Sequence, residues 1–159
     1  MTFSINEIIE FAVQIEKNGY TFYDNALKRK DLSADSRTLL THLRDEEIAH
    51  EITFTGLRDE LNKAELDASG EWDMVGSYLK TIAEAHIFHD EGSSIKVAVQ
   101  AKDEREIFLN AVSFEKDTLL FFHSLGGELK NEKAKNIVKQ IIDEESDHVM
   151  RLKEYYDKM

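Results

Sequence analysis

The 159 residues suffice for one domain with a sizeable core, and the seven Gly and absent Pro favour long helices over a turn-rich β fold. The absence of Cys excludes disulfides, thiolate nucleophiles and Cys-ligated metals, and agrees with the reducing cytoplasm in which we expect the protein. The formal net charge of −12 argues against nucleic acid and anionic membrane surfaces as partners, and either keeps the protein soluble or attracts cations. The N-terminal stretch MTFSINEIIEFAV has no basic region typical of a signal peptide, and no apolar run approaches the roughly 18 residues that span a bilayer.

The first half of the chain predicts two helices joined by a short link. The first begins at Ser4, where Glu7 three residues later completes a capping box, and its apolar period continues to about Lys28. The second starts near Ser33, and its apolar stripe continues to Leu61. Because the link is short, we expect these two helices to pack antiparallel.

The second half predicts a similar pair. A long helix is expected from about Ser94 to the pair Gly126-Gly127, which is a plausible C-cap. The last helix is expected from about Asn131 to Tyr156. Again the connection is short, which favours an antiparallel hairpin.

The residues between the hairpins, 64–93, are numerous enough to carry the chain from one end of a bundle to the other. Residues 73–88 show helical periodicity, and we expect loops at residues 68–70 and 92–94 on either side. His86 and His89 are expected on an exposed amphipathic face, with a stray cation site as the alternative. The sequence therefore predicts an all-α, ferritin-like four-helix bundle, residues 1–159 as a single domain, with two antiparallel hairpins joined by a long crossover carrying a short helix.

Six polar residues interrupt the apolar stripes near the middle of the four long helices. They are Glu16, Glu47, His50, Glu115, Glu145 and His148. Four carboxylates that face one another in a dry core raise one another's pKa, and an unpaired buried charge is strongly unfavourable. No Lys or Arg occupies these inner positions. Two divalent cations would balance four Glu and leave two neutral imidazoles to complete the coordination.

The ligand pattern occurs twice. DEEIAH begins at Asp45 and DEESDH at Asp143, and each contains Glu-x-x-His, whose two side chains share one helix face. A lone Glu precedes each motif by 31 residues in the first half and by 30 in the second. Two similar hairpins related by a pseudo-two-fold axis would each supply half of a two-metal site. Carboxylate and imidazole ligands without thiolate favour iron or manganese over a soft metal, with zinc as a further alternative.

Three further residues are candidates for supporting the site. Glu46 and Glu144 precede the ligand glutamates, and either accept a hydrogen bond from a metal-bound histidine, each from the opposite hairpin, or are solvated surface acids. Tyr23 either donates a hydrogen bond to a ligand carboxylate or fills core space. No separate catalytic residue is assigned beyond the di-metal centre itself.

With this ligand set, the sequence resembles the rubrerythrin-like branch of the ferritin-like di-iron carboxylate superfamily over nearly its whole length. Tyr23 matches a tyrosine that the family places beside the metals, whereas the equivalent position in the second half is Phe122. The chain departs from rubrerythrins in having no Cys-ligated rubredoxin domain, and in having Val112 where they carry an extra Glu.

The resemblance implies two iron ions and a non-haem di-iron oxidoreductase that reduces H₂O₂ or O₂ with an external electron donor, as in oxidative-stress defence. It also implies a homodimer or another small assembly. The alternatives are a ferroxidase that stores or delivers iron and a substrate hydroxylase of the same superfamily.

Overall fold

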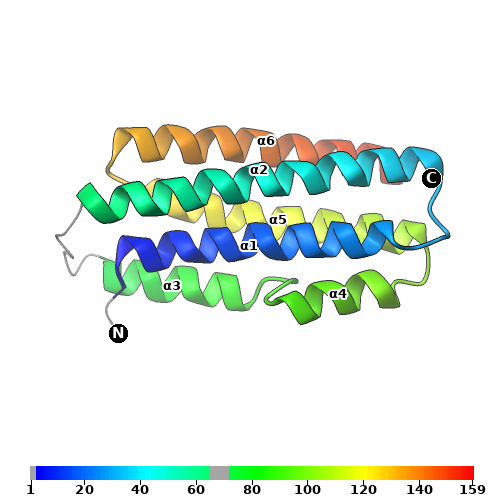
Figure 1. Ribbon diagram of the computed structural model, residues 1–159, viewed down its shortest axis with the longest axis horizontal. Helices are drawn as coiled ribbons and strands as arrows, with labels where there is room; N and C mark the ends of the chain where they lie inside the picture. The colour runs from blue at the N-terminus through cyan, green and yellow to red at the C-terminus, as the bar shows by residue number, and fades with distance from the viewer. Residues whose placement is uncertain (1–2, 65–71) are drawn as a thin grey trace.

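The computed structural model describes residues 3–64 and 72–159, which form six helices and no strand (Figure 1). In chain order the helices are α1 (Ile5–Leu27), α2 (Ala34–Ala64), α3 (Trp72–Glu84), α4 (Glu91–Gln100), α5 (Glu104–Glu128) and α6 (Glu132–Lys158). The all-α prediction is thus confirmed, and the predicted loop at residues 68–70 lies outside the described residues. The predicted loop at residues 92–94 is wrong, because these residues lie in α4. No helix in the described part of the chain is long and apolar enough to cross a membrane.

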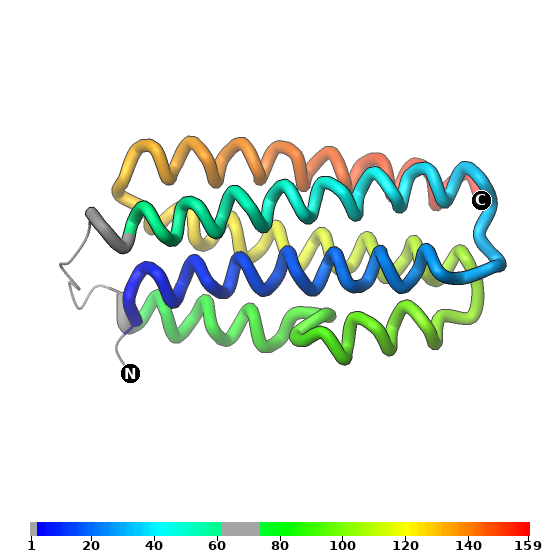
Figure 2. Tube along the Cα trace, in the orientation of Figure 1, coloured from blue at the N-terminus to red at the C-terminus, as the bar shows by residue number. Residues whose placement is uncertain are grey.

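The four long helices lie along one common axis (Figure 1). The short connection 28–33 turns α1 into α2, and residues 129–131 turn α5 into α6, so each pair is antiparallel. Helices α3 and α4 follow one another along the outer side of α1 and α5, and carry the chain back along the bundle (Figure 2). This path brings the middle of all four long helices to one level.

The start of α1 is fixed by the predicted capping box. The Ser4 hydroxyl accepts a hydrogen bond from the Glu7 backbone N–H (3.3 Å), and the Glu7 carboxylate accepts one from the Ser4 N–H (2.8 Å). Helix α6 begins in a related way, because the Asn131 side chain accepts the Ala134 N–H at 3.0 Å.

The predicted continuous helix from Ser94 is wrong, because the chain breaks between α4 and α5. Asp103 caps α5, with one carboxylate oxygen 2.9 Å from the Glu106 N–H, and this cap competes with continued helix. The Arg29 guanidinium donates to the carbonyl oxygen of Ala101 at 2.8 Å, just beyond the end of α4. A cation from the connection between α1 and α2 thus satisfies an acceptor at the break, which the local sequence does not reveal.

The predicted C-cap at Gly126-Gly127 is also wrong, since both glycines lie inside α5 and no described residue has a positive φ. Gly126 instead serves packing. A Cβ on it would lie 3.3 Å from a methyl carbon of Val138 on α6, so the missing side chain allows the two helices to approach closely.

The prediction that His86 lies on an exposed helix face is also wrong. Helix α3 ends at Glu84, and His86 is only 2% exposed rather than on a solvated face. Its Nδ1 accepts the Phe88 N–H at 3.2 Å, so its Nε2 carries the proton and donates to the Thr118 hydroxyl at 3.0 Å. Burial lowers the pKa of His86 to about 4, which keeps the ring neutral.

The segment that follows α3 is therefore anchored to the bundle. Asn18 on α1 donates to the Phe88 carbonyl at 2.9 Å, and the Phe88 ring stacks between Phe22 and Phe114 with centroid distances of 4.5 and 5.1 Å. These contacts seal the core beside the middle of α1 and α5.

Candidate metal centre

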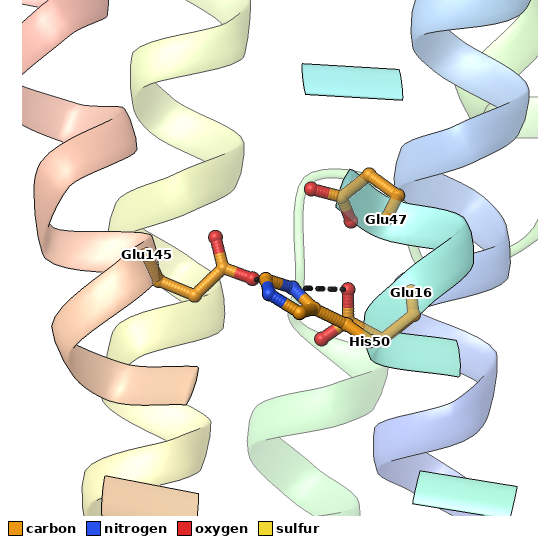
Figure 3. Close-up of side chains that lie close together, drawn as sticks. All are labelled: Glu16, Glu47, His50 and Glu145. Atoms are coloured by element: carbon orange, nitrogen blue, oxygen red, sulfur yellow. Dashed lines mark ion pairs between the residues drawn. The ribbon is translucent and has the colours of Figure 1, made fainter. Parts of the chain in front are cut away.

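The six predicted site residues come together at the centre of the bundle. Their side chains are buried, with all four Glu at 0% exposure and the two His at no more than 3%. Figure 3 shows Glu16 from α1, Glu47 and His50 from α2, and Glu145 from α6 directed toward one another. Helices far apart in sequence thus supply one compact set of oxygen and nitrogen atoms.

The six residues form two overlapping groups, each of which offers four ligand atoms within 4.8 Å of one another. The first group is Glu16, Glu47, His50 and Glu145, and the second is Glu47, Glu115, Glu145 and His148. Glu47 and Glu145 belong to both. One Glu145 oxygen lies 2.8 Å from Nδ1 of His50, and the other lies 2.8 Å from Nδ1 of His148. Glu145 therefore spans the two groups.

The atoms that face the centre have no hydrogen-bond partners. Among buried side-chain nitrogen and oxygen atoms of the described residues, those without a partner belong to these six residues, apart from Oδ1 of Asn6. They comprise seven carboxylate oxygens and both Nδ1 atoms. Although Nδ1 lies near carboxylate oxygens, the geometry is not that of a hydrogen bond. Buried polar atoms in native proteins are nearly always satisfied, and an oxygen and nitrogen donor set of this kind fits divalent iron, manganese or zinc.

The outer nitrogens of the two histidines are held across the hairpin interface. Nε2 of His50 lies 2.7 Å from a Glu144 oxygen, and Nε2 of His148 lies 2.8 Å from a Glu46 oxygen. A carboxylate acceptor keeps a proton on Nε2, so in the neutral ring the Nδ1 lone pair is directed at the centre. The structure thus brings Glu46 and Glu144 to the histidines of the opposite hairpins.

The pKa shifts of the buried glutamates and histidines show that four ionised carboxylates are unfavourable in this site. Burial and the neighbouring carboxylates raise the pKa of Glu16 and Glu47, and that of Glu115 to about 8. Burial opposes protonation of His50, but the carboxylates of Glu145 and Glu16 outweigh it and raise its pKa to about 11. Burial also opposes ionisation of Glu145, but both histidines outweigh it and lower its pKa. Protons or cations must therefore compensate the four carboxylates.

Tyr23 lies inside the bundle and contacts the site directly. Its hydroxyl donates a hydrogen bond to Oε1 of Glu115, with an oxygen separation of 2.6 Å. Burial and the charge of Glu115 raise its pKa well above the ordinary value, so the hydroxyl keeps its proton. Phe122, the equivalent residue of the second hairpin, has no hydroxyl and packs on Phe54 with ring centroids 4.9 Å apart.

Gly19 is a site residue that the sequence analysis did not identify. A Cβ on Gly19 would lie 2.4 Å from the Phe114 ring and 2.5 Å from a Glu47 oxygen, both far below contact distance. The available signal was a glycine one turn after Glu16, on the same face of a helix that needs no turn there.

The case for a metal centre rests on this convergence of buried, unpartnered donor atoms. Comparisons of the chain with protein-family models, with curated proteins and with solved structures gave no match.

Proposed function

We propose that the protein is a non-haem di-iron oxidoreductase that reduces peroxide or oxygen. The observation that carries the proposal is the convergence of seven carboxylate oxygens and two imidazole nitrogens, all buried and without hydrogen-bond partners. Glu16, Glu47 and His50 would hold the ions from one hairpin, and Glu115, Glu145 and His148 from the other.

Charge supports two divalent ions rather than one. Four ionised glutamates carry four negative charges, and two divalent cations balance them while the histidines stay neutral. Metal ligands must be deprotonated, so the ions would replace the protons that these carboxylates otherwise retain. Glu47 and Glu145, which belong to both groups of ligand atoms, are the carboxylates placed to serve both ions.

When bound, two ferrous ions supply the two electrons, and solvent the two protons, that convert H₂O₂ into two waters. The protein contributes the surroundings of that reaction. Tyr23 holds a proton at its hydroxyl, 2.6 Å from Glu115. Phe54, Phe114 and Phe122, all fully buried, keep bulk water from the centre. The hydrogen bonds that the histidines donate to Glu46 and Glu144 fix the imidazole rings.

The arrangement of helices supports the same proposal. Two antiparallel hairpins, α1 with α2 and α5 with α6, are joined by a crossover that carries α3 and α4 along the outside. We propose that this is the ferritin-like bundle and that the chain is a rubrerythrin-like protein. Because the sequence contains no Cys, it offers no thiolate-bound iron, and the proposal includes an external electron donor.

The test uses protein purified without chelator. Elemental analysis should find two transition-metal ions per chain, and both should be lost together in Glu47→Ala, which removes a carboxylate that belongs to both groups of ligand atoms, while the helical content by circular dichroism is largely kept. The protein is then loaded anaerobically with two equivalents of Fe²⁺ and mixed with H₂O₂. The near-ultraviolet absorption of ferric carboxylate should rise in the wild type and not in Glu47→Ala. An unchanged spectrum in the loaded wild type would rule out the proposed activity.

A further inference from the structure

We infer that the two cation positions are unequal, and that the position beside His50 binds its ion first and more tightly than the position beside His148. This inference rests on the proposed function in one respect, namely that the centre holds two divalent cations. It concerns the order of binding, which the repeated ligand motif does not predict, because the two motifs alone suggest equal halves.

The position beside His50 has the fuller set of donors. Both oxygens of Glu16 are buried and unpartnered, and so is Nδ1 of His50. One oxygen of Glu145 lies beside that Nδ1, and Glu47 completes the group. Glu16 can therefore give two oxygens to one ion without breaking any hydrogen bond.

The position beside His148 has a smaller set. It receives the other Glu145 oxygen and shares Glu47. Its remaining glutamate, Glu115, already accepts a hydrogen bond on one oxygen. Oε1 of Glu115 accepts the Tyr23 hydroxyl, and only Oε2 of Glu115 is without a partner. An ion here finds one available oxygen on Glu115, where an ion at the first position finds two on Glu16.

The difference arises from one pair of residues. Tyr23 lies seven residues after Glu16 and reaches across the bundle to Glu115. Phe122 lies seven residues after Glu115, and offers no hydroxyl for the return bond to Glu16. The broken symmetry at Tyr23 and Phe122 thus makes two otherwise similar halves unequal.

Co²⁺ is a suitable probe, because it tests binding without redox chemistry. Metal-free protein is given one equivalent of Co²⁺ and crystallised, and anomalous difference maps locate the ion. We expect the peak beside His50 to be about ten times stronger than the one beside His148, the scale on which residues that support metal ligands alter affinity. Equal peaks, or a stronger peak beside His148, would overturn the inference. Absence of Co²⁺ from both positions, even with excess metal, would instead contradict the proposed metal centre.

Two reciprocal variants test the cause. Tyr23→Phe frees the second oxygen of Glu115. Phe122→Tyr offers Glu16 a hydroxyl from the position equivalent to Tyr23. In each variant the two anomalous peaks should approach equality at one equivalent of Co²⁺. Tyr20→Phe, which removes a hydroxyl from the same helix, is the matched control and should keep the wild-type distribution. A purely structural effect would weaken both positions alike and leave the ratio unchanged. A wild-type ratio in Tyr23→Phe would overturn the inference.

Discussion

Nε2 of His148 lies 2.8 Å from a carboxylate oxygen of Glu46, which belongs to the other hairpin 102 residues away. The same relationship recurs between His50 and Glu144 at 2.7 Å. Each hairpin therefore orients the histidine of its partner, and the two halves of the site depend on each other. Burial opposes the charge on Glu46, but the hydrogen bond and the charge of His148 outweigh it and lower its pKa.

Replacing one of these acceptors should weaken metal binding without removing a ligand. In Glu144→Gln the ring of His50 loses its charged acceptor, and we expect the affinity for Co²⁺ to fall by about 10-fold to 100-fold. Competition with a chelator of known affinity measures the change. Asp143→Asn, which changes an exposed neighbour in the same way, is the control and should bind as the wild type does. Equal affinities in Glu144→Gln and Asp143→Asn would contradict a role for this hydrogen bond in orienting the ligand.

Gly19→Ala should displace Glu47. The new methyl group would overlap the Phe114 ring and a Glu47 oxygen, and the ring cannot retreat easily because it stacks on Phe88. Since Glu47 belongs to both groups of ligand atoms, we expect both metals to be lost, with a cost in stability of about 1–3 kcal/mol from overpacking. Elemental analysis and urea unfolding measure the two effects.

Gly56→Ala is the matched control for that variant. Gly56 also lies inside a long helix, but a Cβ there meets nothing within 4 Å. Removing a glycine from an exposed helix interior should stabilise the protein by roughly 0.5–1 kcal/mol, with metal content unchanged. If Gly19→Ala kept two metals per chain, the close approach at Gly19 would have no role in positioning Glu47.

The long helices and the six central residues could be predicted because both depend on local periodicity. Glu16 and Glu115 stood out as polar residues at positions where an apolar residue was expected, and the spacing of Glu47 and His50 places them on one face of any helix. Because each of the six residues lies near the middle of its helix, packing the four helices side by side predicts that they meet. The hydrogen bond of Tyr23 to Glu115 was weighed against simple packing, and the structure provides the contact.

The features that were missed depend on contacts between distant segments. His86 has the local sequence of an exposed helix, and its burial follows from Thr118, 32 residues away. The break before α5 is stabilised by Arg29 from the connection between α1 and α2, and Gly126 is explained by Val138 on α6. None of these partners lies within one helical turn, so no local pattern could reveal them.

Thr118→Val should destabilise the fold while sparing the metals. The substitution keeps the shape of the side chain but removes the acceptor of the Nε2–H of His86, which is then buried without a partner at a cost of about 1–3 kcal/mol. Urea unfolding measures the loss, and elemental analysis should still find wild-type metal content. Thr53→Val changes an exposed threonine in α2 and should have a much smaller effect. If the two variants were equally stable, the His86 hydrogen bond would not anchor the crossover.

Removal of the metals should make the stability of the protein fall as the pH rises. The folded protein holds a proton on Glu115 between its ordinary pKa of 4.5 and about 8, and one on His50 between 6.5 and about 11, which the unfolded chain releases. Each such proton lowers the free energy of unfolding by about 1.4 kcal/mol per pH unit within its range. Urea unfolding of chelated protein from about pH 5.5 to about pH 8.5 should show this decline. The affinity for Co²⁺ should rise over the same range, because the ions displace these protons. Chelated protein whose stability is constant or increases with pH would show that the buried carboxylates and histidines do not retain protons when the metals are absent.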